Sequence, residues 1–225
     1  MPRITDQRRE ARREQILEAA RACLQDHGLE AVSMEMIIAR SGLSTGAVYG
    51  YFKGKDEIIN AAVIEGTAAL ARELAPILQN PKPPPPPELL EQVLQTIVDF
   101  GRRKGGIDRL LVAIHGWSHS QSNPKLKATT RTNSQTLRRF YAEVAEKWRA
   151  SGAIAGDPNA LAELLTSITL GFVAQRALAG GADVAAHVDA LGALLHESGA
   201  ASARPTATTP RRRSSARRRS THPGT

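Results

Sequence analysis

Between residues 33 and 55 the sequence places small residues directly ahead of tyrosines and lysines. The Thr45 hydroxyl and the Ala47 methyl group can contact base edges in the major groove of DNA. Gly46 between them has no side chain, so a helix at this position can lie deep in the groove. Side chains suited to phosphate oxygens follow at Tyr49, Tyr51, Lys53 and Lys55. The pattern predicts a surface that meets base edges at its centre and the DNA backbone at its flank.

The same segment carries the signals of two short helices joined by a tight turn. Ser33 and Ser44 are suited to cap the two helix starts, and Gly42 supplies the left-handed backbone that a sharp turn needs. Backbone amides at the Ser33 helix start offer a further phosphate site. The geometry is that of a helix-turn-helix, whose second helix enters the major groove. Two ordinary core helices joined by a glycine turn are the alternative.

Residues 44–52, with the sequence STGAVYGYF, and the KGKDE that follows resemble the DNA-binding signature of TetR-type regulators. An arginine-rich lead-in, the EQILEAA segment at residues 14–20 and Gly28 agree with this signature, so the resemblance covers residues 8–63. The family's phosphate contacts fall on Ser33, Tyr49, Tyr51 and Lys55. Its base-reading end falls on Thr45 and Gly46.

The resemblance implies a cytoplasmic, ligand-responsive transcriptional regulator, in most of the family a repressor. Such a protein binds a palindromic operator in double-stranded DNA as a homodimer, and a small-molecule effector releases it. Three residues depart from the family pattern: Ile38 replaces a small residue, Gly54 replaces a frequent serine cap, and Glu35 stands where basic or polar side chains are common. Glu35 either accepts from a cytosine amine or repels phosphate.

A helical period runs through most of the chain, and no segment shows sustained strand-like alternation, so we predict an all-α fold of about nine helices. The expected parts are a helix-turn-helix domain at residues 1–55, a helical ligand-binding and dimerisation domain at 56–198, and a disordered arginine-rich tail at 199–225. Gly28 is expected to end the first helix. The prolines between residues 81 and 87 predict an extended spacer between two helices.

A ligand pocket is suggested by the helix expected at residues 124–150, whose inward stripe turns polar at Thr130 and Asn133. Buried polar groups without partners are unfavourable, so this stretch either faces water or lines a cavity that a ligand fills. The candidate lining of this pocket is Trp117, Thr130, Asn133, Leu137, Phe140, Phe172, Gln175 and Arg176. A partly exposed helix without a ligand is the alternative.

The last two helices are rich in alanine and glycine between leucines, which favours close helix pairing across a two-fold axis. We therefore expect a homodimer through these helices, although an intramolecular pair is the alternative. No apolar stretch reaches the ~20 residues of a membrane helix, because Glu163 and Arg176 interrupt the richest region. The chain is expected to have no membrane contact and no secretory signal.

The net charge of +8 is unevenly placed, because seven arginines lie beyond residue 198 in a segment without any acid. The rest of the chain is nearly neutral, so the high isoelectric point says little about the folded part. The tail favours non-specific attraction to phosphates. An architectural DNA-binding protein that acts through this tail is the alternative function, and a dispensable solubilising end is the alternative for the tail itself.

The sequence gives little indication of metal binding or catalysis. His115 and His119 are spaced to share a metal, but no carboxylate or cysteine clusters with them, and Cys23 is the single cysteine. We therefore predict no metal, no cofactor and no catalytic site, and hence a protein that is not an enzyme. The arginines between residues 3 and 13 either reach the minor groove as an arm or form a solvated helix face.

Overall fold

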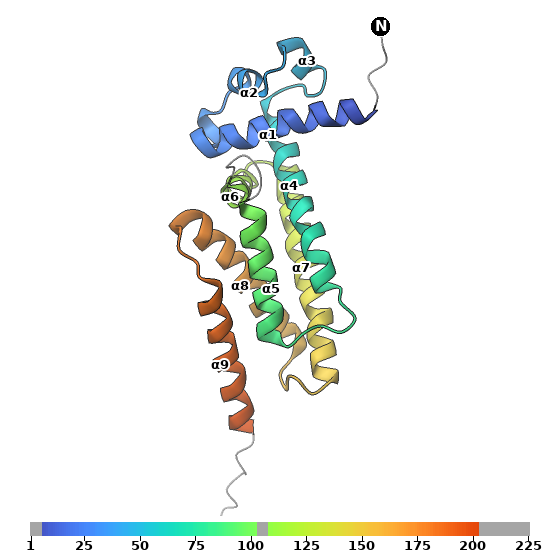
Figure 1. Ribbon diagram of the computed structural model, residues 1–225, viewed down its shortest axis with the longest axis vertical. Helices are drawn as coiled ribbons and strands as arrows, with labels where there is room; N and C mark the ends of the chain where they lie inside the picture. Colours follow the sequence, from blue (N-terminus) through green and yellow to red (C-terminus); the bar gives the residue numbers. More distant parts are fainter. Residues whose placement is uncertain (1–5, 103–107, 203–225) are drawn as a thin grey trace, which may run out of the picture.

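The computed structural model describes residues 6–102 and 108–202, with side chains described as far as residue 195. Within these ranges the chain is entirely helical, as predicted, and contains no strand (Figure 1). The helices are α1 (Asp6–Ala31), α2 (Met34–Ser41), α3 (Thr45–Tyr49), α4 (Lys55–Leu78), α5 (Pro86–Gly101), α6 (Arg109–His119), α7 (Pro124–Ala150), α8 (Pro158–Ala179) and α9 (Val184–Ser202).

The N-terminal head consists of α1, α2, α3 and the first turns of α4. Its core is formed by the apolar stripe of α1, including Ile16 and Leu24, together with Ile37, Val48 and Ile58, all of which are fully buried. Gly28 has φ 73° and ψ 173°, so the helical backbone breaks there, and one more short turn follows before α1 ends at Ala31. The first helical stretch of α1 therefore ends at Gly28, as predicted, and a kink separates it from the residues up to Ala31.

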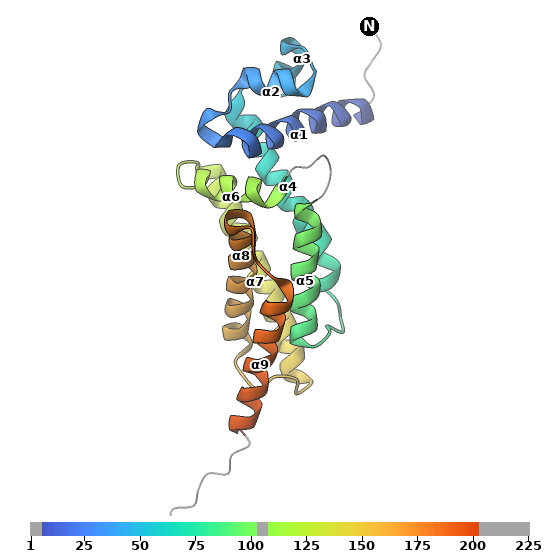
Figure 2. The same ribbon diagram turned by 60° about the vertical axis from the view of Figure 1, so that its left-hand side comes forward.

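The helix α4 joins the head to the body that lies below it in Figures 1 and 2. At its start Ile58 and Ile59 belong to the core of the head, and at its end Leu74 and Leu78 belong to the core of the body. One helix therefore contributes to both hydrophobic cores.

The body packs α5, α7 and α8 around a second core, with α6 lying across the end that meets the head (Figure 2). Tyr141 on α7 is fully buried, and its hydroxyl forms a hydrogen bond of 2.7 Å with Thr169 on α8. Burial raises the pKa of Tyr141 far above its ordinary value, because the phenolate is disfavoured away from water. A satisfied polar pair thus fixes α7 against α8.

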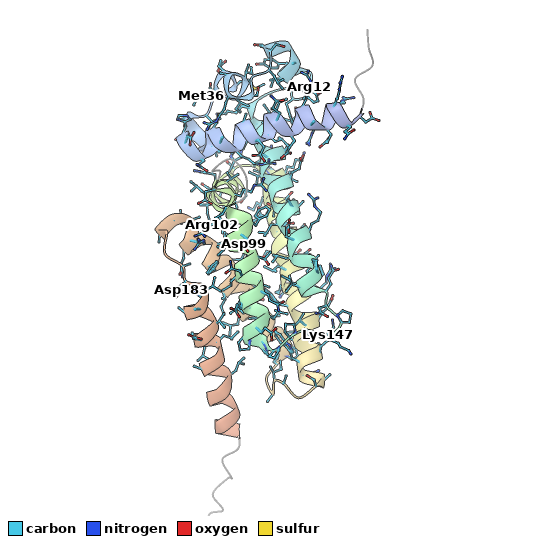
Figure 3. All side chains as sticks on the ribbon, viewed as in Figure 1. Arg12, Met36, Asp99, Arg102, Lys147 and Asp183 are labelled. Carbon is cyan, nitrogen blue, oxygen red and sulfur yellow. The ribbon has the colours of Figure 1, made fainter. Side chains whose placement is uncertain are left out.

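The proline segment is only partly the spacer that the sequence predicted. Pro86 and Pro87 lie in the first turn of α5, where a missing N–H costs nothing. Ahead of them, the carbonyls of Asn80 and Pro84 accept hydrogen bonds from Lys147 Nζ at 2.9 Å and Trp148 Nε1 at 2.8 Å. Lys147 lies at the far end of the body in Figure 3. The segment is therefore tied to the end of α7.

At the C-terminal end, α8 and α9 form one flank of the body (Figure 1). Leu164 and Leu178 on α8 and Leu194 on α9 are exposed. In contrast to the sequence prediction, α8 is long and apolar enough to cross a membrane, judged by length and composition alone. One such helix is weak evidence for a membrane span, because core helices of soluble proteins pass the same test. The helix α9 runs to Ser202, beyond the predicted boundary at residue 198, and the predicted tail from residue 203 lies outside the described residues.

Candidate DNA interface and internal cavity

The turn between α2 and α3 is built as the sequence predicted. The Ser33 hydroxyl accepts from the Met36 N–H at 3.3 Å, and the Ser44 hydroxyl accepts from the Ala47 N–H at 3.3 Å, so both short helices carry side-chain caps. Gly42 adopts the left-handed conformation with φ 66° and ψ 14°. These local interactions fix the angle at which α3 leaves the head.

The helix α3 is anchored on one side and open on the other. Val48 is fully buried, and Phe52, just after the helix, is 4% exposed. Thr45 and Gly46 are exposed at the start of α3, and Tyr49 at its end is 50% exposed. No atom lies within 4 Å of the position that a side chain on Gly46 would take. The open side is therefore narrow and available to a partner, and α3 forms the end of the molecule farthest from α9 (Figure 1).

The flanking side chains divide by exposure. Lys53 is exposed beside Tyr49, whereas Tyr51 and Lys55 are half-buried and Tyr51 packs against the core of the head. The backbone N–H of Lys53 donates to Glu57 Oε2 at 2.7 Å, which secures the start of α4, where Gly54 offers no capping side chain. Tyr49 and Lys53 are thus free to reach outward, while Tyr51 and Lys55 are held by their surroundings.

Ser33 and Glu35 interact with each other at the start of α2. A hydrogen bond from the Ser33 hydroxyl, and a second from the Glu35 backbone, lower the pKa of the Glu35 carboxyl below its ordinary value. Glu35 is exposed, so it places a negative charge beside the expected DNA surface. A carboxylate therefore stands beside the Ser33 hydroxyl, at the position where the sequence placed a phosphate contact.

The arginines of α1 do not act as one group. Arg8, Arg9 and Arg12 are exposed, and Arg12 lies in the head (Figure 3). In contrast, Arg13 forms an ion pair with Glu65 of α4 and lies over the Phe52 ring at 5.5 Å. The hydrogen bond from Arg13 Nη1 to Glu65 is 2.8 Å long. Arg13 is therefore a structural link from α1 to α4, and Arg3 lies outside the described residues.

An internal cavity of about 310 Å³ opens in the body between α4, α6, α7 and α8. It is lined by five of the eight residues suggested by the sequence, namely Trp117, Thr130, Asn133, Leu137 and Phe140. The polar stretch of α7 borders this cavity together with Thr129, Ser134 and Thr136. The position of Thr130 and Asn133 is thus one at which a bound molecule can meet their polar groups.

The other three suggested residues do not line this cavity. Phe172 is fully buried on another side of α8, where its ring meets that of His187 on α9 with centroids 5.3 Å apart. Gln175 is exposed. Arg176 donates to the Ala182 carbonyl at 3.3 Å and borders a separate, more open hollow of about 390 Å³. All three residues belong to α8, but their spacing along one helix does not fix the direction in which each side chain points.

Sequence reasoning missed two arginines of the cavity, Arg21 on α1 and Arg109 on α6. One signal was present for Arg21: it lies within the apolar run of α1, among Ala20, Ala22 and Cys23, where a charged side chain is unusual. Arg109 had no comparable signal, because it begins a short helix next to a glycine-rich segment.

The histidine pair was also a sequence candidate. Among the described residues, no group of three histidine, cysteine or carboxylate side chains is arranged to hold a metal ion. His119 is partly buried, and its Nε2 has no hydrogen-bond partner there. Cys23 is buried, and burial raises the pKa of its thiol, which keeps it protonated and unreactive.

Comparison with known proteins agrees with this geometry. The profile of "Bacterial regulatory proteins, tetR family" matches residues 16–62. The HTH-type transcriptional regulator UidR of Escherichia coli K12 is 27% identical over 165 residues, which cover 72% of this chain and 80% of UidR. The HTH-type transcriptional repressor AcnR of Corynebacterium diphtheriae is 32% identical over 75 residues, which cover 33% of this chain and 40% of AcnR.

The fold extends this similarity beyond the head. A solved transcriptional regulator from Saccharomonospora viridis, in complex with choline, superposes with a TM-score of 0.64 at 19% identity over 83% of this chain and 96% of that chain. Residues 16–62 thus carry the helix-turn-helix segment of the bacterial tetR-family regulatory proteins. Over most of its length the chain is similar to HTH-type transcriptional regulators.

Proposed function

We propose that this protein is a cytoplasmic repressor of the TetR family, which binds a palindromic operator as a homodimer and leaves it when a small molecule fills the cavity of the body. The position of α4 is the observation that supports this most strongly. Ile58 and Ile59 at its start are buried in the head, and farther along Leu70 and Leu74 line the cavity. A ligand that moves this wall therefore moves the base of the DNA-reading head.

On the DNA, the exposed start of α3 is suited to base edges. Thr45 and Gly46 lie there without neighbours that cover them, and Ala47 follows half-buried. Tyr49 and Lys53 are exposed and suited to phosphates of the flanking backbone, while the half-buried Tyr51 and Lys55 can reach phosphates only close to the head. A phosphate at Ser33 has to approach the neighbouring Glu35 carboxylate.

A homodimer through α8 and α9 fits the exposed leucines of this flank. Leu178 is 68% exposed and Leu164 is 45% exposed on the same helix, an unusual position for large apolar side chains of a water-facing surface. Pairing two copies about a two-fold axis buries them and presents two α3 helices to successive major grooves about 34–36 Å apart. The same burial accounts for the apolar composition of α8.

Release of the operator follows from a change in the separation of the two heads. A coupling free energy of about 1–3 kcal/mol changes the operator affinity about 5–150-fold. The choline bound to the Saccharomonospora viridis regulator and the repressor name of AcnR support the two parts of this scheme, effector binding and repression.

A mobility-shift experiment tests the DNA part. An operator is first selected from random duplexes with the full chain, and wild type is then compared with Tyr49→Ala and Lys53→Ala, with Lys147→Ala at the far end of the body as the matched control. We expect about tenfold weaker binding for each head variant, and for Lys53→Ala a salt slope lower by about one. Unchanged affinity and slope in both head variants would refute the interface. If deletion of residues 204–225 alone abolishes binding, the architectural alternative replaces this one.

A further inference from the structure

We propose that the effector is an amphipathic anion, whose apolar body fills the cavity and whose acidic group binds Arg21 and Arg109 at the end next to the head. The inference rests on the proposed function, because it names the chemical class of the molecule that the cavity takes. It is carried by the charges of the cavity wall and by the burial of its two guanidinium groups.

The wall of the cavity is apolar over most of its extent and carries charge at one end. Leucine, valine and isoleucine side chains from five helices line it, with Trp117 and Phe140. A row of hydroxyl and amide groups from α7 adds neutral polar contacts. Among its described lining residues the ionisable ones are Arg21 and Arg109, and none is acidic. A ligand therefore meets apolar surface, neutral polar groups and two positive charges.

The carboxylates that pair with these arginines lie on the water side. Arg21 Nη1 is 2.7 Å from Glu14 and 3.1 Å from Glu18, and Arg109 Nη2 is 3.0 Å from Glu18. The side chains of Arg21 and Arg109 are 5% and 17% exposed, whereas those of Glu14 and Glu18 are 46% and 28% exposed. Water screens the acids more than the arginines, so the positive charge dominates inside the cavity.

The two guanidinium groups also hold unused hydrogen-bonding capacity. The Nε atoms of both Arg21 and Arg109 are buried and have no hydrogen-bond partner. A buried donor without a partner is unfavourable, and an arginine presents five donors in a planar fork that suits carboxylate and sulfonate oxygens. A small rotation of either side chain about a bound anion brings these donors into use. A cation at the same end would have to displace the guanidinium groups from Glu14 and Glu18.

The position of the charged end links the ligand to the head directly. Arg21 and Glu18 belong to α1, and Arg109 belongs to α6 in the body. An anion that binds Arg109 competes with Glu18 for the same guanidinium group. The bridge between α1 and α6 is thereby exchanged for a bridge through the ligand, so the acidic group of the effector acts on the helix that positions the helix-turn-helix.

Two dyes that differ only in one sulfonate test the inference. 8-Anilinonaphthalene-1-sulfonate and neutral N-phenyl-1-naphthylamine both fluoresce in apolar cavities, and their affinities are measured on the full-length protein without DNA. We expect wild type to bind the sulfonate about tenfold or more tightly than the neutral dye. Arg109→Gln should remove this preference without weakening the neutral dye, Arg109→Lys should keep most of it, and the exposed Arg138→Gln should change neither.

Location is tested by Thr130→Trp, which fills the cavity and should weaken both dyes. A thermal melt of each variant separates loss of binding from loss of folding. Equal affinity for the two dyes, a sulfonate preference that survives Arg109→Gln, or sulfonate binding that Thr130→Trp leaves unchanged would overturn the anion proposal. Binding of the neutral dye alone leaves an effector cavity in place and refutes only its charge, whereas failure of both dyes to bind argues against the cavity as an effector site as well.

Discussion

The head and the body of this protein are both built from packed helices, but their cores differ, because the core of the body borders a cavity. In the head, Val48, Ile37 and Ile58 are fully buried, and caps at Ser33 and Ser44 hold the two short helices. In the body, Trp117 and Phe140 remain only partly buried beside a cavity of about 310 Å³. The difference suits a reading surface that must keep its shape and a sensor that must change it.

The largest effect that separates the two regions is expected from removing the aromatic anchor of the head. Phe52→Ala deletes a ring that is 4% exposed and should cost about 3–5 kcal/mol in the free energy of unfolding. Operator affinity should fall with it, because α3 loses its support. The matched body variant Phe172→Ala should cost a similar amount yet leave operator binding by the folded fraction intact. Urea unfolding and mobility shifts measure both, and equal loss of operator binding would erase the distinction.

The contact between α6 and α4 should show how the two regions communicate. A Cβ added at Gly116 would lie 2.4 Å from Val63 Cγ1, so Gly116→Ala forces α4 away from α6. We expect a destabilisation of about 1–3 kcal/mol and a weaker operator complex even without effector. The double variant Gly116→Ala with Val63→Ala makes room for the methyl group and should restore operator affinity. If the single variant binds operator as wild type does, α4 does not carry the signal at this point.

The N-caps of α3 in the head and α8 in the body can be removed at a similar cost in the free energy of unfolding. Ser44→Ala removes the side-chain cap of α3, and Asp157→Ala removes the cap that accepts from Asn159 at 3.1 Å and Ala160 at 3.3 Å in α8. Each should cost about 1 kcal/mol of stability. Only Ser44→Ala should also weaken operator binding, because it loosens a helix of five residues that faces the DNA. Equal operator affinities at matched stability would show that α3 needs no cap to dock.

The smallest expected effect concerns Glu35 and pH. The bond from Ser33 lowers the folded-state pKa of Glu35 below the ordinary 4.5, so its contribution is present above that value and is lost as pH falls through the folded pKa. Glu35→Gln should therefore reduce the melting temperature slightly near neutral pH, and the reduction should shrink as pH falls through the folded-state pKa of Glu35. A difference that is larger in acid would reverse the sign of this interaction.

The local chemistry of the head was readable from the sequence because it depends on neighbours a few residues apart. Ser33, Gly42 and Ser44 specify the turn through bonds within the same segment, so the caps and the left-handed glycine agree with prediction. The bounds of α7, Pro124–Ala150, agree with the helix predicted at residues 124–150. The division of Tyr49 from Tyr51 by exposure was not readable, because it depends on packing against α1 and α4.

The sequence by itself determined the all-α fold, the helix-turn-helix and the polar stretch of α7, since each is written in periodicity or local capping. Only the tertiary structure decided that Phe172 and Arg176 point away from the cavity and that Arg21 and Arg109, distant in sequence, meet at its charged end. Side-chain direction at a helix surface is fixed by which helices pack against it. That choice depends on contacts between residues far apart in the chain, which spacing along one helix does not contain.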